Sequence, residues 1–444
     1  MKLHLYTTTF ENEIRNTVEV EKEWEKDCER ENQLINLYPQ VKYQKLDGFG
    51  GAITDSAGYV YSLMNKEQQK KVTDTYFGQD GMRYTRVRIP IDSCDFSLEH
   101  YEADAGPMDE GFEHFSFERV EKYILPLLDA AQQSYGRKLD IMLSPWSPPA
   151  YMKTNGERNH GGKLLLKYRQ RYADYLCRYI MEYRKRGYQV TKLTMQNEPK
   201  AVQNWDSCVY TAAEEKEFLC DFLWPALQRN GLGDIEIYLW DHNKERVFEW
   251  AEEILDTDAR DMVAGMAFHW YSGDHFEALN MIRQKYPDKK LLLSEACIEY
   301  CKFAADDYLQ NAQKYAHDMI GNFCNGMNDF YDWNLLLNEE GGPNHVGNFC
   351  DAPFLFDIGS RQLKEGTLLA YLWHFTHFLQ PGAQRIGLTR YTDQLEAVAF
   401  EREGKITVVM LNRTKQQIPV WLRLGEWCVT MEAEPESIMT AVVS

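Results

Sequence analysis

Two glutamates each close an apolar run and stand among amides and small residues. Glu198 ends the stretch LTMQNE, and Glu295 ends LLLSE. Paired carboxylates can divide the cleavage of a glycosidic bond between a proton donor and a nucleophile. Each glutamate taken alone could equally form a buried ion pair with an arginine or cap a helix, because structural ion pairs are common. Together they form a candidate site for carbohydrate chemistry.

Two histidines introduce a metal site as an alternative. His242 and His269, together with Asp241 and Glu295, are residue types that bind zinc. The sequence contains no HExxH motif, however, and its first strand candidate carries no HxH pair. We therefore predict no metal ion and no cofactor, and we interpret both histidines as polar groups close to the acids.

Aromatic residues are abundant, at 13% of the chain with 27 Tyr and 11 Trp. Such a surplus suits a large core, and it also suits carbohydrate, whose C–H faces stack on aromatic rings. Trp146, Trp270 and Trp333 each follow an apolar run, where a single tryptophan is most often part of the core. We predict that Trp146 and Trp333 form a stacking wall for a sugar.

From residue 48 onward, short β-type runs alternate with longer helical segments. The strand candidates are residues 49–54, 85–91, 139–146, 192–198, 235–243, 265–271, 291–297 and 329–338. The clearest helix spans 164–186, where tyrosines recur every three or four residues among charged ones. Eight such units favour a (β/α)8 barrel, because parallel strands need crossover helices. A doubly wound sheet is the competitor, but it normally carries a GxGxxG turn that residues 48–51 do not match.

The positions of the two acids fit the barrel prediction. Catalytic residues of such barrels lie on the loops after the strands, so the ends of the fourth and seventh strands would face each other across the mouth. Residues 381–444 instead show short alternating runs separated by turns, which is typical of a β-sandwich. Residues 1–12 and 34–46 also contain strand-like patches, whereas the charged stretch 18–32 is ambiguous. We predict a (β/α)8 catalytic barrel at 47–380 and an attached β-sandwich domain built from residues 1–46 and 381–444.

The charge balance and the cysteines restrict the possible partners and the cell compartment. Lys plus Arg number 49 and Asp plus Glu 68, a net charge of −19, which repels phosphate backbones, so we predict no nucleic-acid partner. No run of about 18 apolar residues occurs, so we predict no membrane span. The ten cysteines lack CxxC spacing and are expected to be reduced, mostly buried thiols. No signal-peptide run is visible, so we expect a cytoplasmic location. The sequence does not indicate an oligomeric state.

Several motifs follow one another in the order found in glycoside hydrolase family 30, and the sequence most closely resembles its glucosylceramidase-like branch. The resemblance covers about residue 34 to the C-terminus. The matching blocks are GFGGAITDSA (48–57), RIPIDSCDFS (88–97), LSPWSPPAYMKTNG (143–156), QNEP (196–199), HWY (269–271), SEAC (294–297) and WNLLLNEEGGPN (333–344), followed by AVAF and VVMLNRT.

The resemblance implies a retaining, exo-acting β-glycosidase that acts on small β-linked glycosides, most simply a β-glucosidase or a glucosylceramidase-like enzyme of sphingolipid metabolism. By the QNEP motif, Glu198 carries over as the general acid/base. By the SEAC motif, Glu295 carries over as the nucleophile. The predicted substrate contacts are Arg88, Asp95, Trp146, Asn197, His269, Tyr271 and Trp333.

These roles carry physical expectations. Arg88 near Glu295 is expected to lower the pKa of that nucleophile, whereas an ionised Glu295 and partial desolvation are expected to raise the pKa of Glu198. Asn197 is expected to bind the sugar 2-OH. Asp95 is expected to accept hydrogen bonds from the 4-OH and 6-OH, which favours a hexose over a pentose.

Some features leave alternatives open. The same family includes enzymes that act on β-xylosides, β-fucosides and β-1,6-glucans, and an inactive carbohydrate-binding barrel is the alternative from another class. His345 stands where glucosylceramidases usually have a tryptophan, so contacts to the aglycone are expected to differ in that loop. The lack of a visible secretory signal argues against a lysosomal or secreted role with membrane lipid as the substrate.

Overall fold

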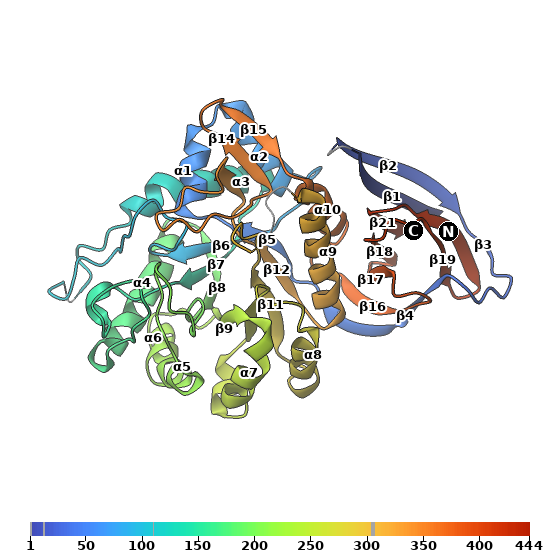
Figure 1. Cartoon of the computed structure of the whole chain (residues 1–444). Coiled ribbons are helices and arrows are strands. Elements are labelled where there is room, and N and C mark those ends of the chain that lie inside the picture. The colour runs from blue at the N-terminus through green and yellow to red at the C-terminus, as the bar shows by residue number, and fades with distance from the viewer. Residues whose placement is uncertain (1, 12–13, 110, 303–306) are drawn as a thin grey trace.

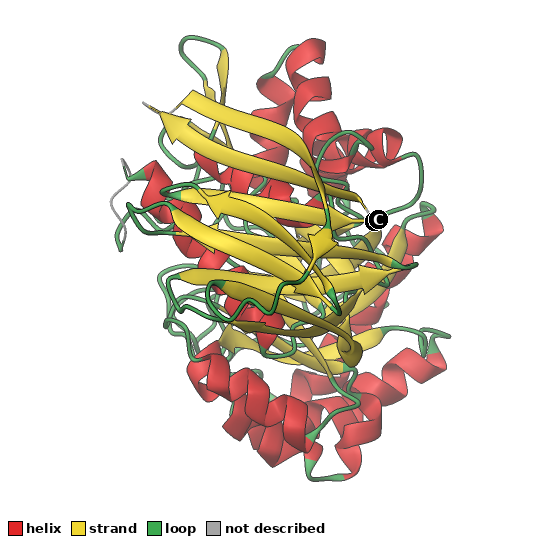
Figure 2. Ribbon diagram, turned by 90° about the vertical axis from the view of Figure 1, so that its right-hand side faces the viewer, coloured by secondary structure: helices red, strands yellow, loops and turns green. Residues whose placement is uncertain are grey.

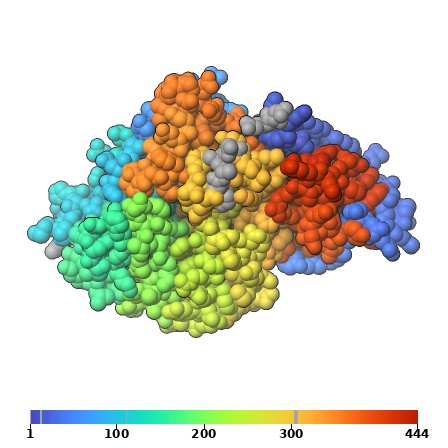
Figure 3. All heavy atoms as spheres, in the orientation of Figure 1, coloured from blue at the N-terminus to red at the C-terminus, as the bar shows by residue number. Residues whose placement is uncertain are grey.

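The protein has two domains, a barrel and a β-rich side domain packed against it (Figure 1). The structure, a computed structural model, describes residues 2–11, 14–109, 111–302 and 307–444. In the space-filling view, the segments from the two ends of the chain lie together on one side of the molecule (Figure 3). The side domain is thus assembled from both ends of the chain, as the sequence predicts.

Eight parallel strands close the barrel in chain order. They are β5 (Gly48–Ala52), β6 (Arg86–Ile91), β7 (Asp140–Pro145), β8 (Gln189–Thr194), β9 (Glu236–Asn243), β10 (Gly265–His269), β11 (Lys290–Glu295) and β12 (Asp329–Asp332). All eight predicted strands are confirmed, most with ends shifted by one or two residues, and the largest differences concern β8 and β12. β8 stops at Thr194, four residues before the predicted end, and the last predicted strand is broken after Asp332, since Asn334 takes a left-handed conformation with φ of 62°.

Helices surround the barrel strands (Figure 1). They are α1 (Asp55–Leu63), α2 (Lys66–Phe77), α3 (Leu125–Tyr135), α4 (Arg169–Lys185), α5 (Ala212–Phe218), α6 (Trp224–Arg229), α7 (Val247–Leu255), α8 (Phe276–Lys285), α9 (Tyr308–Cys324) and α10 (Thr367–Thr376). The predicted helix over 164–186 is α4, preceded by a 3₁₀ turn at Leu166–Tyr168. Its tyrosines form one buried face against the barrel, as their spacing indicates.

The glycine-rich start of β5 makes room for an arginine of the next strand. A Cβ atom at Gly48 would lie 2.7 Å from Arg86 Nε, and one at Gly50 would lie 2.4 Å from the Arg86 carbonyl oxygen. Side chains two residues apart on a strand share a face, so Arg86 and Arg88 both point into the barrel. Inside the barrel, one apolar cluster comprises Met142, Tyr238, Ala267, Leu292 and Tyr331.

In the described part of the side domain, ten strands follow one another in a continuous hydrogen-bonded order, and Figure 2 shows a broad face of this sheet. The strands are β1 (Lys2–Glu11), β2 (Ile14–Glu23), β3 (Glu25–Lys26), β4 (Leu34–Lys45), β16 (Gln384–Arg390), β17 (Leu395–Arg402), β18 (Lys405–Asn412), β19 (Ile418–Leu424), β20 (Trp427–Ala433) and β21 (Ser437–Val443). Residues from both halves of this order, such as Leu5 and Val429, share one core cluster, so the sheet curls into a β-sandwich-like shape. The ambiguous stretch 18–32 contains the end of β2 and all of β3, and Met1 and Asn12 lie outside the described residues.

Buried polar contacts join the two domains. Gln44 of β4 donates to the carbonyl oxygen of Phe323 at 2.6 Å. His374 of α10 lies 2.7 Å from Thr8 Oγ1 and 2.8 Å from Thr440 Oγ1, and burial lowers its pKa to about 3. His374 is therefore a neutral bridge between the barrel and the first and last strands of the chain.

A small third sheet follows the last barrel strand and comprises β13 (Leu336–Asn338), β14 (Phe354–Asp357) and β15 (Gln362–Glu365). All ten cysteines lie in the described part of the chain, and all are free thiols, six of them buried. Among the described helices, none has the length and apolar character needed to cross a bilayer.

Candidate active site

Glu198 lies on irregular backbone beyond the end of β8, rather than on the strand itself. Its φ is 48°, in the left-handed region that is unfavourable for a glutamate. Two backbone hydrogen bonds hold the segment: Asn197 N–H donates to the Pro145 carbonyl at 2.8 Å, and Glu198 N–H donates to the Asp241 carbonyl at 2.9 Å. Strain of this kind persists only where the surroundings fix it, and it is concentrated at functional sites.

Glu295 is the last residue of β11, and both of its carboxylate oxygens are occupied. Arg88 Nη1 donates to Oε2 at 2.6 Å, and the Tyr271 hydroxyl donates to Oε1 at 2.8 Å. The side chain is only 9% exposed. Fixed donors on both oxygens hold this carboxylate in one orientation.

Arg88 of β6 lies fully buried beneath the mouth of the barrel. Its Nη2 donates to Asn197 Oδ1 at 2.9 Å and to Asp241 Oδ2 at 2.8 Å. The guanidinium also lies 4.7 Å from the ring centre of Trp146. One arginine therefore positions Glu295 and the amide beside Glu198, and its charge is balanced by two carboxylates.

His269, at the end of β10, stands between the acids. Its Nδ1 lies 3.2 Å from Glu198 Oε1, and its Nε2 lies 3.1 Å from Asp241 Oδ1 and 4.0 Å from Glu295 Oε2. Burial lowers the pKa of His269, but the three carboxylates outweigh burial and raise it to about 9. At neutral pH the imidazole is protonated and donates from both nitrogens.

The pKa values of the two glutamates differ in direction from those predicted. Burial raises the pKa of Glu198, but His242 and His269 outweigh burial and leave it below its ordinary value. Burial and the nearby Glu198 raise the pKa of Glu295, and it stays above its ordinary value although His269 and Arg88 lower it. The sequence prediction was wrong here because it placed no imidazolium between the acids and underestimated the burial of Glu295. In this arrangement the proton nearest to Glu198 lies on His269.

A cavity of about 120 Å³ contains both acids in its wall. Five predicted substrate contacts line it, namely Asp95, Trp146, Asn197, Tyr271 and Trp333. The other two, Arg88 and His269, are fully buried and do not line the cavity. Arg88 contacts Glu295, and His269 contacts Glu198.

The aromatic residues at the mouth divide into two groups. Trp146 and Trp333 stack on one another, with ring centres 5.2 Å apart and planes 19° apart, and both line the cavity. Trp270 instead packs against Tyr315 with ring centres 4.8 Å apart, in the main core of the barrel. The role of Trp146 and Trp333 as a stacking wall for a sugar stays a prediction, and Trp270 is a core residue.

Several residues of the site have no assigned role in the sequence analysis. Asp241 joins Arg88 to His269, and its position at a strand end was a signal that could have identified it. Asn348 donates to Asp95 Oδ2 at 3.0 Å from a loop far along the chain, where no periodic pattern marks it. The remaining wall residues are Gln203, Trp205, His242, Asn243, Cys297, Glu299, Lys302 and Cys350.

A larger groove of about 720 Å³ lies in the side domain, where Trp24, Tyr38, Arg423 and Trp427 contribute to its lining. No carboxylate is found among the residues that line it. That groove therefore lacks the acid and nucleophile that the cavity at the barrel mouth contains.

A parallel eight-stranded barrel with two carboxylates in one mouth cavity defines the class of (β/α)8 glycoside hydrolases. Sequence comparison identifies the family within this class. The Glycosyl hydrolase family 30 TIM-barrel domain matches residues 46–379, and the Glycosyl hydrolase family 30 beta sandwich domain matches residues 382–441. The chain belongs to glycosyl hydrolase family 30 and is a glycoside hydrolase.

Individual relatives agree with this assignment. The lysosomal acid glucosylceramidase of Mus musculus is 33% identical over 406 residues, covering 87% of this chain and 78% of the mouse protein. The crystal structure of SrfJ from Salmonella typhimurium superposes with a TM-score of 0.95 at 37% identity, covering 100% of this chain and 99% of that one. The endo-β1,6-glucanase BT3312 superposes with a TM-score of 0.87 at 26% identity, covering 100% and 99%.

Proposed function

We propose that the protein removes a terminal, neutral β-linked hexose, best a glucose, from small glycosides with retention of configuration. One observation carries this proposal: Glu198 and Glu295 face a single small cavity, but only Glu295 has both oxygens held by fixed donors. A clamped carboxylate suits in-line attack on the anomeric carbon, whereas a less restrained one suits proton transfer.

In the first half of the reaction, Glu295 attacks the anomeric carbon while Glu198 protonates the departing oxygen. A bound sugar would displace water from the cavity and desolvate Glu198, which raises the pKa of that carboxyl. His269 Nδ1, 3.2 Å from Glu198 Oε1, is placed to share its proton with the acid. Glu198 has by then given its proton to the leaving group, and the loss of the negative charge on Glu295 in the ester favours the ionised form of Glu198. In the second half Glu198 accepts a proton from the water that attacks the anomeric carbon, which releases Glu295 as a carboxylate.

Asn197 and Asp95 provide contacts for the sugar hydroxyls. Arg88 holds Asn197 Oδ1, which leaves the amide N–H groups of Asn197 free to bind a 2-OH in the cavity. Asp95 is held by Asn348 at one oxygen and lines the cavity, so its other oxygen is available for the 4-OH and 6-OH of a hexose. This contact favours glucose over xylose.

The size and charge of the cavity support exo action on an uncharged sugar. About 120 Å³ suits one ring rather than a chain of rings bound on both sides. Four acids line the cavity, Asp95, Glu198, Glu295 and Glu299, against one lysine, Lys302. Burial raises the pKa of Asp95 well above its ordinary value and favours its neutral form, whereas the ionised carboxylates of the wall disfavour glycosides that carry a carboxylate or a phosphate.

The main alternative is endo-acting cleavage of β-1,6-glucan, and the likeness to BT3312 favours it. A β-xylosidase or β-fucosidase with the same mechanism would need only a different fit around Asp95. A panel of nitrophenyl β-glycosides that includes glucose, xylose, fucose and galactose, run beside linear β-1,6-glucan, separates these options.

We expect the highest kcat/KM with the β-glucoside and a β-anomer as the first product seen by proton NMR. Release of oligosaccharides from the glucan with no glucose would overturn exo action. A first-formed α-anomer would overturn retention.

A further inference from the structure

Three potential metal ligands from distant parts of the chain converge beside the active-site cavity. His100 follows β6, Asp206 follows β8, and His345 lies between β13 and β14. One ligand atom from each lies within 4.8 Å of the other two. None of these residues belongs to the catalytic network of Arg88, so the cluster needs an explanation of its own.

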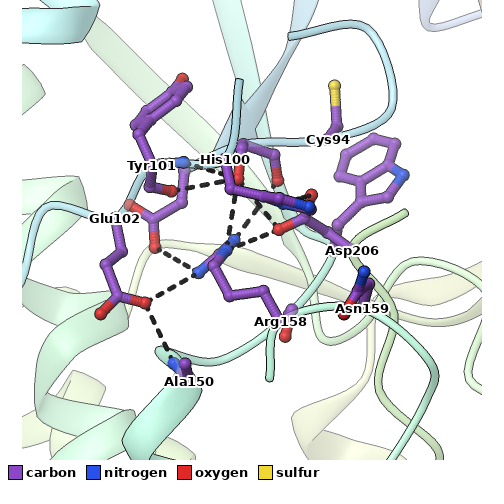
Figure 4. A network of polar contacts seen from close by, with 12 residues as sticks. Cys94, His100, Tyr101, Glu102, Ala150, Arg158, Asn159 and Asp206 are labelled. Carbon is purple, nitrogen blue, oxygen red and sulfur yellow. Dashed lines mark hydrogen bonds and ion pairs between the residues drawn. The ribbon is translucent and has the colours of Figure 1, made fainter. Parts of the chain in front are cut away.

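Asp206 is a buried and firmly oriented carboxylate (Figure 4). Its Oδ1 accepts from Arg158 Nε at 2.5 Å and from Ser93 Oγ at 2.9 Å. Its Oδ2 faces His100, whose Nδ1 lies 3.1 Å away. Contacts to both oxygens therefore fix the direction in which this carboxylate points.

His345 presents a nitrogen lone pair in a defined direction. Its Nδ1 lies 2.9 Å from the Ser97 carbonyl oxygen and must donate to it, which leaves Nε2 unprotonated in the neutral ring. Nε2 is shielded from solvent and has no hydrogen-bond partner among the described residues. Histidines that bind metals commonly donate their second N–H to a backbone carbonyl in this way.

His100 completes the cluster from the solvent side. Its ring meets the ring of His345 edge to face, with centres 4.5 Å apart, and its side chain is 40% exposed. Zinc bound at about 2.0–2.1 Å to each of two ligands separates them by roughly 3.4 Å in tetrahedral geometry. The present upper limit of 4.8 Å exceeds this spacing by roughly 1.4 Å, and rotation of the exposed His100 side chain can reduce the difference.

We propose that His100, Asp206 and His345 form a binding site for a divalent transition-metal ion, with Zn²⁺ as the best match. Two imidazole nitrogens and one carboxylate oxygen are ligands that zinc accepts, and water can fill a fourth position. Mg²⁺ and Ca²⁺ prefer oxygen ligands, so two imidazoles disfavour them. Asp92 and Glu102 lie beside Arg158 and add the negative charge that a cation needs.

A bound ion would tie together three loops of the active-site wall. His100 follows Asp95 by five residues, Asp206 directly follows Trp205, and His345 precedes Asn348 by three. Asp95, Trp205 and Asn348 all line the cavity. Metal binding is therefore expected to stabilise the rim and lower KM for the glycoside, while the catalytic carboxylates act without the metal.

The test uses the full chain stripped with a chelator and titrated with Co²⁺, a spectroscopic stand-in for Zn²⁺. We expect visible d–d absorption that saturates near one equivalent and disappears when Zn²⁺ is added. Calorimetry with Zn²⁺ should show the same stoichiometry, and the bound form should have a higher Tm. Absence of a saturable site in the intact protein would overturn the proposal.

Substitutions test whether the metal binds to His100 and His345. His100→Ala removes an exposed side chain, and we expect at least about tenfold weaker Co²⁺ binding with an unchanged circular dichroism spectrum. His345→Ala should have the same effect. His114→Ala is the matched control, because His114 lies 3.7 Å from Asp109 in a surface His–Asp pair outside the cluster. Equal affinity in wild type and His100→Ala would overturn the assignment, and hydrolysis by the stripped enzyme tests the proposed function separately.

Discussion

Arg86 and Arg88 lie two residues apart on one barrel strand, and both meet buried carboxylates. Arg86 pairs with Asp329 near the start of the strands, and Asp329 is also 3.6 Å from Lys192. Arg88 pairs with Asp241 and Glu295 near the end of the strands. Two networks with the same chemistry thus occupy opposite ends of one barrel.

The two networks differ in what lies beyond the carboxylate. Asp329 is 1% exposed and lies beside two cations, Arg86 and Lys192, which balance its charge within the protein. Glu295 lines a cavity, faces a second carboxylate across it and meets a protonated His269. A buried arginine–carboxylate pair is therefore structural by default and becomes catalytic only where a cavity and a second titratable group adjoin it.

Glu295→Gln should show the largest effect. The amide keeps the shape but cannot form the glycosyl ester, so we expect kcat to fall by about 10⁴-fold or more, as when other enzymes lose their nucleophile. The measurement is steady-state hydrolysis of a nitrophenyl β-glucoside, with the circular dichroism melt as the control for folding. A kcat within tenfold of wild type would make Glu295 another structural carboxylate like Asp329.

Glu198→Gln should lose about 10²–10⁴-fold, the usual contribution of general acid/base catalysis. The loss should be smaller with a leaving group that needs no proton, such as dinitrophenolate. Azide should restore turnover and yield a β-glycosyl azide, because a small anion can attack the trapped glycosyl ester without a base. Equal losses for good and poor leaving groups would contradict the acid/base role.

Asp329→Asn should break the network of Arg86 and should lower stability rather than activity. Removing one partner of a buried ion pair leaves an uncompensated charge, so we expect the free energy of unfolding to fall by about 3–5 kcal/mol. Urea denaturation measures this change. The kcat of the remaining folded protein should stay close to wild type, and a specific loss of kcat would contradict the separation of the two networks.

Stability should depend on pH through His269. Its pKa rises from 6.5 to about 9 on folding, so its stabilising contribution is complete below about pH 6.5 and is lost as pH rises through about 9. A shift of this size corresponds to about 3 kcal/mol. Urea denaturation between pH 6 and 10 should show this decline, and His269→Asn should flatten it. A wild-type profile with the same slope as the variant would contradict a protonated His269.

Much of the fold could be predicted from the sequence because its signals are local. Eight apolar runs alternating with helical stretches indicate the barrel, and turn-separated alternation near the C-terminus indicates the side domain. The end of β8 could not be placed, because LTMQNE continues the strand pattern although the backbone bends after Thr194. The domain boundaries at residues 46/47 and 380/381 and the cytoplasmic location stay predictions.

The candidate site was predictable only in part. Glu198 and Glu295 each end an apolar run, which indicates a strand end at the barrel mouth. The family motifs identify the residues around them. The protonation of His269 depends on three carboxylates brought together from strands distant in sequence, which no local pattern reveals. The cluster of His100, Asp206 and His345 also spans loops far apart in the chain, so only the folded structure brings it into view.

The most direct test of the central claim is covalent trapping of the nucleophile. The protein is incubated with an activated 2-deoxy-2-fluoro-β-glucoside, and the intact mass and its peptides are measured. We predict an increase of one fluorosugar on the peptide that contains Glu295, and no increase in Glu295→Gln. An unchanged wild-type mass with every sugar of the panel, or a label that persists in Glu295→Gln, would contradict the account.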